Sequence, residues 1–144
     1  GPFQRLAAKA KVVRLVLARW WRGVWRKYLA SYSVYVLECE GGKYYVGSSL
    51  RRKARLAEHL SERGGSAWTR KHKPLRTVES VDRIPSRYYL GVEASKTAEY
   101  MLRFGVNNVR GAYLSHPRPF TAGDAPMLSG FIGHFNDLSF RALE

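Results

Sequence analysis

Acidic residues are scarce in this sequence. Its 144 residues include 25 Lys and Arg but only 11 Asp and Glu, so the formal net charge is +14 and the pI is near 10.3. A surplus of this size is typical of proteins that bind an anionic partner, most often nucleic acid and next an anionic membrane surface. A ribosomal type of surface, or charge that only aids solubility, is the alternative.

Cysteine is also scarce, and long apolar runs are missing. The single Cys39 excludes an internal disulfide framework and any cysteine-based zinc site, and it fits a reducing compartment. We expect an intracellular location, which for a DNA-binding protein would be the nucleus or another DNA-containing compartment if the source is eukaryotic. No run of 18 apolar residues occurs, so we expect no membrane span. Hydrophobic residues make up 45% of the chain, which indicates a folded domain. The start Gly1-Pro2 is typical of a protease remnant, so we expect the natural chain to extend upstream.

Residues 4–30 contain no acidic residue, no proline and a single glycine. Apolar residues recur there at spacings of three and four, the period of a helix: Leu6, Ala10, Val13, Leu17, Trp20, Val24 and Tyr28. Basic residues fall largely on the other side, so we predict one long basic amphipathic helix. Three roles are open: packing on the domain, following a DNA backbone, or acting as a membrane-surface, transit-peptide or calmodulin-type segment.

The rest of the chain predicts a small α/β layer. Two runs rich in β-branched and aromatic residues, 34–37 and 44–46, flank Gly41-Gly42 and predict a hairpin. We expect a helix at 50–63, a loop at 66–75, a third strand at 76–84, and a second helix from Tyr88 to Phe104 that stops at Gly105. The expected fold is thus a three-stranded antiparallel sheet flanked by helices, followed by loop and short helix.

Two short motifs of the hairpin, "SVY" at 33–35 and "YVG" at 45–47, resemble the signature of the GIY-YIG endonuclease superfamily. Arg55 lies eight residues after Gly47, where the family has its helix arginine, and His59 follows one turn later. The stretch "GGSAWTRKHKPL" resembles the basic loop of the structure-specific, junction-cleaving branch. The stretch "VEASKTAEYMLRFGVNNVRGAY" is similar to the "E…T…YM…yG…NVRGG" segment of one subgroup. Ser33 departs from the pattern, which has glycine there.

The resemblance divides the chain into three parts and implies a metal-dependent nuclease. We expect a basic helix in 1–31, a GIY-YIG nuclease-like domain in 32–115, and an extension in 116–144 that packs on it. Mg²⁺ or Mn²⁺ would act as the cofactor, and one protein carboxylate is enough because Mg²⁺ keeps most of its waters. Glu93 occupies the position of the subgroup's carboxylate; Glu99, with Arg103 four residues later, and Glu79 are the alternatives.

Four further residues receive catalytic roles from the resemblance. Tyr45 would act as general base or orient the water, Tyr35 would orient Tyr45 or a phosphate, and Arg55 would neutralise the scissile phosphate. His59 would assist proton transfer or hold a phosphate, because its pKa lies near neutrality. Each also has a structural alternative. The two tyrosines would only pack their rings within the strands, and Arg55 and His59 would be solvated residues on a helix surface.

The basic residues after the hairpin predict a cradle for phosphates, in which Trp68 would stack on an unpaired base. The expected nucleic-acid contacts are Lys43, Ser48, Arg51, Arg52, Lys53, Trp68, Arg70, Lys71, His72, Lys73, Asn108 and Arg110. Asn108 also matches a late asparagine of the family that is structural or binds water. The predicted function is a DNA endonuclease acting on branched, flapped or otherwise structured DNA. An inactive nucleic-acid-binding module, or a sequence-specific enzyme of the mobile-element or restriction type, is the alternative.

Overall fold

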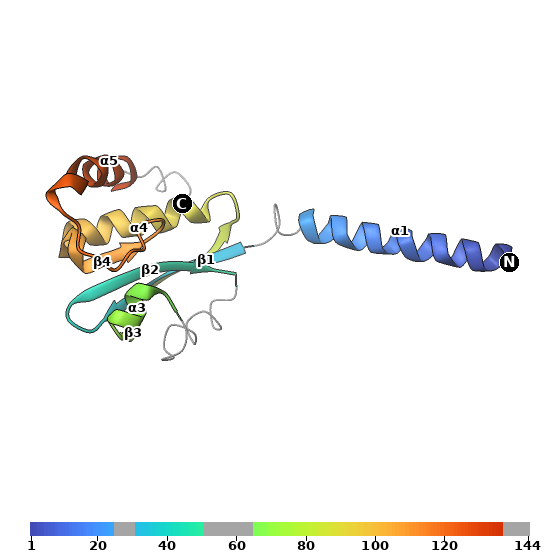
Figure 1. Cartoon of the computed structure of the whole chain (residues 1–144), viewed down its shortest axis with the longest axis horizontal. Coiled ribbons are helices and arrows are strands. Elements are labelled where there is room, and N and C mark those ends of the chain that lie inside the picture. Colours follow the sequence, from blue (N-terminus) through green and yellow to red (C-terminus); the bar gives the residue numbers. More distant parts are fainter. Residues whose placement is uncertain (25–30, 51–64, 137–144) are drawn as a thin grey trace.

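The computed structural model describes residues 1–24, 31–50 and 65–136 of the chain (Figure 1). Its helices and strands are, in order, α1 (Pro2–Val24), β1 (Ser31–Cys39), β2 (Lys43–Ser49), α3 (Ala67–Lys71), β3 (Pro74–Pro85), α4 (Tyr89–Phe104), η2 (Val106–Asn108), β4 (Val109–Gly111), η3 (Ala122–Asp124) and α5 (Ala125–Asn136). The helix predicted at 50–63 and the end of the one predicted at 4–30 lie outside the described residues.

The sheet has the strand order β3-β1-β2-β4. β1 pairs antiparallel with both β2 and β3, which confirms the three predicted strands. The turn between β1 and β2 uses Gly41 and Gly42 at φ of 76° and 70°, a backbone region that favours glycine. The sequence did not predict β4, which joins parallel to β2 and makes the sheet a mixed one of four strands. Three residues are too few for a periodic pattern.

Two layers of helix cover one face of the sheet, and α3 lies on the other (Figure 1). Alternation along β1 and β2 sends Val34, Val36 and Val46 to the α4 face, where they form the main core with Ala98 and Met101. α5 packs on the outer side of α4 through Leu128 and Phe131. Every second residue of β1 points to the opposite face and forms a smaller cluster: Tyr35, Leu37 and Cys39. Burial raises the pKa of the Cys39 thiol to about 12.

The predicted second helix is confirmed by α4, which ends at Phe104. Gly105 caps it at φ 95° and donates its N–H to the Met101 carbonyl, as expected for a glycine stop. The prediction of a loop at 66–75 was partly wrong, because α3 occupies Ala67–Lys71. Ser66 and Thr69 form a capping box there, which allows a helix of little more than one turn.

α1 confirms that most of the predicted N-terminal segment is helical. None of its residues is buried, so its apolar side chains do not pack on the domain as one of the three predicted roles required. Figure 1 shows the helix clear of the sheet and of the other helices. No helix in the described ranges is long and apolar enough to cross a membrane.

Candidate nuclease site

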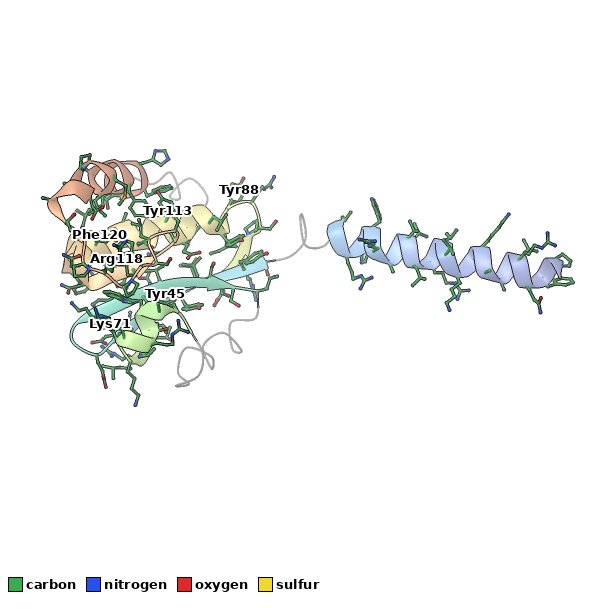
Figure 2. The ribbon with its side chains drawn as sticks, in the orientation of Figure 1. Tyr45, Lys71, Tyr88, Tyr113, Arg118 and Phe120 are labelled. Atoms are coloured by element: carbon green, nitrogen blue, oxygen red, sulfur yellow. The ribbon has the colours of Figure 1, made fainter. Side chains whose placement is uncertain are left out.

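The two motif tyrosines lie on the face of the sheet that points away from α4. Tyr35 pairs with Gly47, and Leu37 with Tyr45, so these side chains share one face. Tyr35 is fully buried, and a Cβ at Gly47 would come within 2.7 Å of its hydroxyl oxygen. The glycine of the second motif is therefore needed so that the ring of the first motif can lie across β2. Tyr45, labelled in Figure 2, is half-buried and packs against the small cluster that contains Tyr35.

Glu93 is a buried carboxylate near the amino end of α4, only 8% exposed. Its Oε2 accepts a hydrogen bond from the Ser48 hydroxyl at 2.6 Å, and its Oε1 accepts one from the Ala112 backbone N–H at 3.0 Å. Burial raises the pKa of Glu93, and these two hydrogen bonds lower it by less. In the described ranges no Lys, Arg or His forms an ion pair with it. Glu93 thus carries a desolvated charge that a cation would stabilise.

Glu79 and Glu99 have a different environment, because Lys96 lies between them. The Lys96 ammonium is 2.6 Å from Glu79 and 3.1 Å from Glu99. Burial alone would raise the pKa of Glu79, but hydrogen bonds from Lys96 and Tyr100 lower it overall. The predicted pair of Glu99 with Arg103 is wrong: Arg103 lies over the rings of Tyr100 and Phe104. Both alternative carboxylates therefore already have a cation beside them.

Glu93 and the two tyrosines lie on opposite faces of the sheet. Ser48 alternates with Gly47 on β2, so it points to the α4 face and meets Glu93 there. Tyr45 and Tyr35 point the other way. A site that used all three would have to extend around the end of β2, which stops at Ser49.

A pocket of about 440 Å³ opens beside Glu93, between α4 and α5. Its lining is largely apolar and consists of Leu90, Gly91, Glu93, Ala94, Ala112, Tyr113 and Phe135. Tyr113 is exposed, and the edge of its ring meets Phe131 of α5 (Figure 2). Glu93 therefore forms part of the wall of this pocket.

The "NVRG" stretch has a structural function that corrects the predicted DNA contact of Arg110, whereas that of Asn108, which is only partly buried, stays a prediction. Arg110 is fully buried, and its guanidinium donates to four backbone carbonyls, those of Val106, Val109, His116 and Arg118, at 2.7–2.8 Å. Burial lowers the pKa of Arg110 to about 10. Asn108 accepts from Lys43 at 2.6 Å and donates to the Phe104 carbonyl, so it fastens the end of α4 to the hairpin. Arg110 cannot reach a phosphate from this position.

Three residues that sequence reasoning missed place the loop that holds Glu93. A Cβ at Gly111 would come within 2.5 Å of the Thr97 hydroxyl and 2.8 Å of Val46, so glycine lets β4 pass closely between α4 and β2. Thr97 is fully buried and donates to the Glu93 carbonyl at 2.8 Å. Ala112 adopts φ 52° and thereby points its N–H at the Glu93 carboxylate. The only sign of them in the sequence was the T and the RG of the "E…T…YM…yG…NVRGG" segment, which correspond to Thr97 and Gly111.

Trp68 does not have the exposed ring that base stacking requires. It is 2% exposed, its Nε1 donates to the Tyr44 carbonyl at 2.9 Å, and its ring lies against the Arg110 guanidinium. The ring faces inward because the α3 helix turns it under the edge of the sheet.

The cations around Trp68 are exposed, unlike its ring. They are Arg70, Lys71 and Lys73, and Lys71 lies on the α3 side of the sheet in Figure 2. Burial lowers the pKa of His72, and the nearby charges of Lys43, Lys71 and Arg110 lower it further. The predicted residues Arg51, Arg52, Lys53, Arg55 and His59 lie outside the described residues.

The sheet, the tyrosine hairpin and the helix with a buried carboxylate define an α/β domain of the nuclease class. The family model of the GIY-YIG catalytic domain matches residues 31–102, and the chain belongs to this family. No curated protein and no solved structure matches the chain significantly. Family membership implies nuclease activity in general, DNA as the substrate, and a general dependence on divalent metal.

Proposed function

We propose that the protein is a divalent-metal-dependent endonuclease that hydrolyses phosphodiester bonds in branched, flapped or otherwise structured DNA. The observation that supports this most is Glu93. It is buried, accepts hydrogen bonds from two donors, has no basic partner in the described ranges, and contributes to the wall of a pocket. Mg²⁺ or Mn²⁺ would supply Lewis acidity and stabilise the leaving oxygen.

The donor set around Glu93 fits a magnesium-type ion. Each carboxylate oxygen accepts one hydrogen bond and keeps a further lone pair. The described residues contain no cluster of three or more His, Cys, Asp or Glu, so a site here would have to bind the ion with fewer than three such side chains. Mg²⁺ accepts such a site because it retains waters. The Ser48 hydroxyl beside Glu93 would then hydrogen-bond to one of these waters instead.

The other proposed roles belong to the two tyrosines and to basic side chains named from the resemblance, among them Arg55, His59 and the cations of the α3 segment. Tyr45 activates or orients the attacking water, and Tyr35, held across Gly47, fixes the orientation of Tyr45. Arg55 neutralises the phosphate that is attacked, and His59 assists proton transfer. The exposed cations of the α3 segment contact phosphates of the backbone, which favours recognition of DNA shape over sequence. The proposed site thus lies around the end of β2.

The test is cleavage of flap, junction and linear duplex DNA in Mg²⁺, in Mn²⁺ and in EDTA. We expect metal-dependent cutting of the branched substrates. Glu93→Ala should lower it at least about a hundredfold, since a lost transition-state contact in a water-poor site has that effect. Glu99→Ala is the matched control, because this glutamate lies on the same helix α4, after Glu93, and has Lys96 beside it.

Other outcomes separate the alternatives. Binding without cutting in both metals would favour an inactive nucleic-acid-binding module. Equal cutting of linear duplex at one sequence would favour a sequence-specific enzyme. Loss of activity in Glu99→Ala, with Glu93→Ala active, would move the metal to the other carboxylate.

A further inference from the structure

The surface of α1 has no partner within the described structure. Its large apolar side chains are among the most exposed of the chain, with Phe3 84%, Leu6 63% and Trp20 63% exposed. Ordinary globular surfaces show such residues singly, and a continuous series of them marks an interaction site. The position of the helix in Figure 1, away from the other elements, leaves this series accessible.

The apolar residues of α1 are concentrated on one side. Six large ones, which we call the apolar stripe, are Phe3, Leu6, Val13, Leu17, Trp20 and Trp21. At 3.6 residues per turn they occupy an arc of about 100°, the width expected of a helix that buries one face. No charged residue falls within this arc. The closest ones are Lys9 and Arg14, one on each border.

All charge on α1 is positive. Six cations, Arg5, Lys9, Lys11, Arg14, Arg19 and Arg22, lie outside the stripe, and the helix has no Asp or Glu. The cations project in many directions around the helix rather than converging on one point (Figure 2). The partner must therefore be negative over a broad area and apolar beneath that charge.

The charge and the stripe together select among possible partners. A DNA duplex would pair with the cations but leave the stripe in water. The α1 helix of a second copy would cover the stripe, but it would bring its own Lys9 and Arg14 close to those of the first copy. Neither helix has an Asp or Glu that could offset this repulsion between positive charges. An anionic lipid surface accommodates both the stripe and the cations. The stripe enters the boundary of the acyl chains, while the long cationic side chains extend to the headgroups.

We propose that α1 binds in the plane of an anionic membrane surface and attaches this chain to it. Trp20 and Trp21 lie at the level of the headgroups, as amphipathic rings do. Lys9 and Arg14 extend from the borders of the stripe to lipid phosphates or carboxylates. This attachment does not depend on the catalytic proposal, since it uses none of the nuclease residues.

The test is co-sedimentation of the whole 144-residue chain with vesicles of phosphatidylcholine, with or without phosphatidylserine. We expect binding to the anionic vesicles, weak binding to the neutral ones, and release at high salt. The double substitution Val13→Gln/Leu17→Gln on the stripe should weaken binding at least about tenfold, because two buried apolar side chains are lost.

The helix offers a matched control. Val12 and Leu15 are both 59% exposed, close to the 55% of Val13 and 57% of Leu17, but they lie outside the stripe. Val12→Gln/Leu15→Gln should bind vesicles as the unaltered chain does. Equal effects of the two doubles, equal binding to neutral vesicles, or no vesicle binding would overturn the proposal. Stripe-dependent self-association, stripe-dependent binding of duplex DNA, or binding only to an acidic protein would also overturn it.

Discussion

Glu93 is the residue whose chemistry depends most on its surroundings. A glutamate at the start of a helix is usually solvated, but this one lies beneath the end of β2 with its charge desolvated. The two nearby glutamates share a lysine, and the pKa of Glu79 is lowered. Carboxylates on the same side of the sheet therefore have pKa values displaced in opposite directions, which is typical of functional sites.

This difference predicts the pH dependence of stability. The folded-state pKa of Glu93 is raised above that of the unfolded chain. Protonated Glu93 therefore contributes to the free energy of unfolding below the ordinary carboxyl pKa, and this contribution is lost as the pH rises through the raised value. Glu93→Gln should remove that loss and stabilise the fold at neutral pH. Glu79→Gln should act in the opposite direction, because a lowered pKa contributes stability above the ordinary value that is lost on acidification.

The measurement is thermal unfolding across pH, with and without Mg²⁺ or Mn²⁺. Metal should raise the melting temperature of the unaltered chain at neutral pH and leave Glu93→Gln unaffected, because a ligand that binds the folded state stabilises it. If the melting temperatures of the unaltered chain and of Glu93→Gln changed with pH in parallel, this would contradict a raised pKa of Glu93. A metal response in both would place the ion elsewhere.

Ala112 gives a second prediction for a single residue. It occupies φ 52°, where the similar motif has glycine, and alanine is disfavoured in this left-handed region. Ala112→Gly should raise the free energy of unfolding by roughly 0.5–1 kcal/mol, the relief of strain less the flexibility gained by the unfolded chain. Urea denaturation measures it. Ala98→Gly, inside α4, should instead lower stability by about 1 kcal/mol.

Among the elements, β4 and the segment after it form the support of the candidate site. Arg110 lies between the rings of Trp68 and Phe120, 4.6 and 4.0 Å from their centroids, and ties together segments 106–109 and 116–118. It thereby holds the loop whose Ala112 N–H meets Glu93. The same side chain connects α3, β4 and the start of the C-terminal segment.

Arg110→Lys should lower the free energy of unfolding by about 3 kcal/mol or more. A lysine ammonium has three donors on one point, so it cannot reach four carbonyls spread around a planar fork, and each buried carbonyl left unpaired is costly. Chemical denaturation measures this. The control Arg118→Lys changes an exposed side chain and should stay within about 0.5 kcal/mol. Equal stability of the two variants would mean that Arg110 is not a structural residue.

For the whole molecule, the net charge of +14 predicts DNA binding that weakens steeply with salt. We expect the α3 segment, where Lys43, Lys71 and Arg110 lie near His72, to supply part of this affinity. Lys71→Gln/Lys73→Gln should reduce the slope of log affinity against log salt by about 2, close to 0.9 for each lost phosphate contact. Fluorescence anisotropy over a salt series measures it.

The control removes the same charge from a different part of the molecule. Arg87→Gln/Arg103→Gln takes away two cations near the ends of α4, where they lie over aromatic rings. This double should leave the slope nearly unchanged. If both doubles reduced the slope equally, the affinity would depend on net charge alone and the α3 segment would have no special position.

Local sequence patterns were sufficient for much of this molecule. Alternation and Gly41-Gly42 predicted the hairpin, the helical period and Gly105 predicted α4, and the two tyrosine motifs predicted the family. These features depend on residues close in sequence, whose propensities act before any tertiary contact forms. The acid-poor composition likewise predicted a basic surface.

Only the tertiary structure decided what the individual site residues do. Ser48 lies 45 residues before Glu93 and Ala112 lies 19 residues after it, so no local pattern could show that both bind its carboxylate. Trp68 and Arg110 looked like DNA contacts until the docking of α3 on β4 buried them together. The sequence alone was enough for the hairpin, α4 and the family, because these depend on neighbours along the chain, but it did not predict the short elements β4 and α3. The packing of distant elements determined which side chains remain available for DNA and which support the fold.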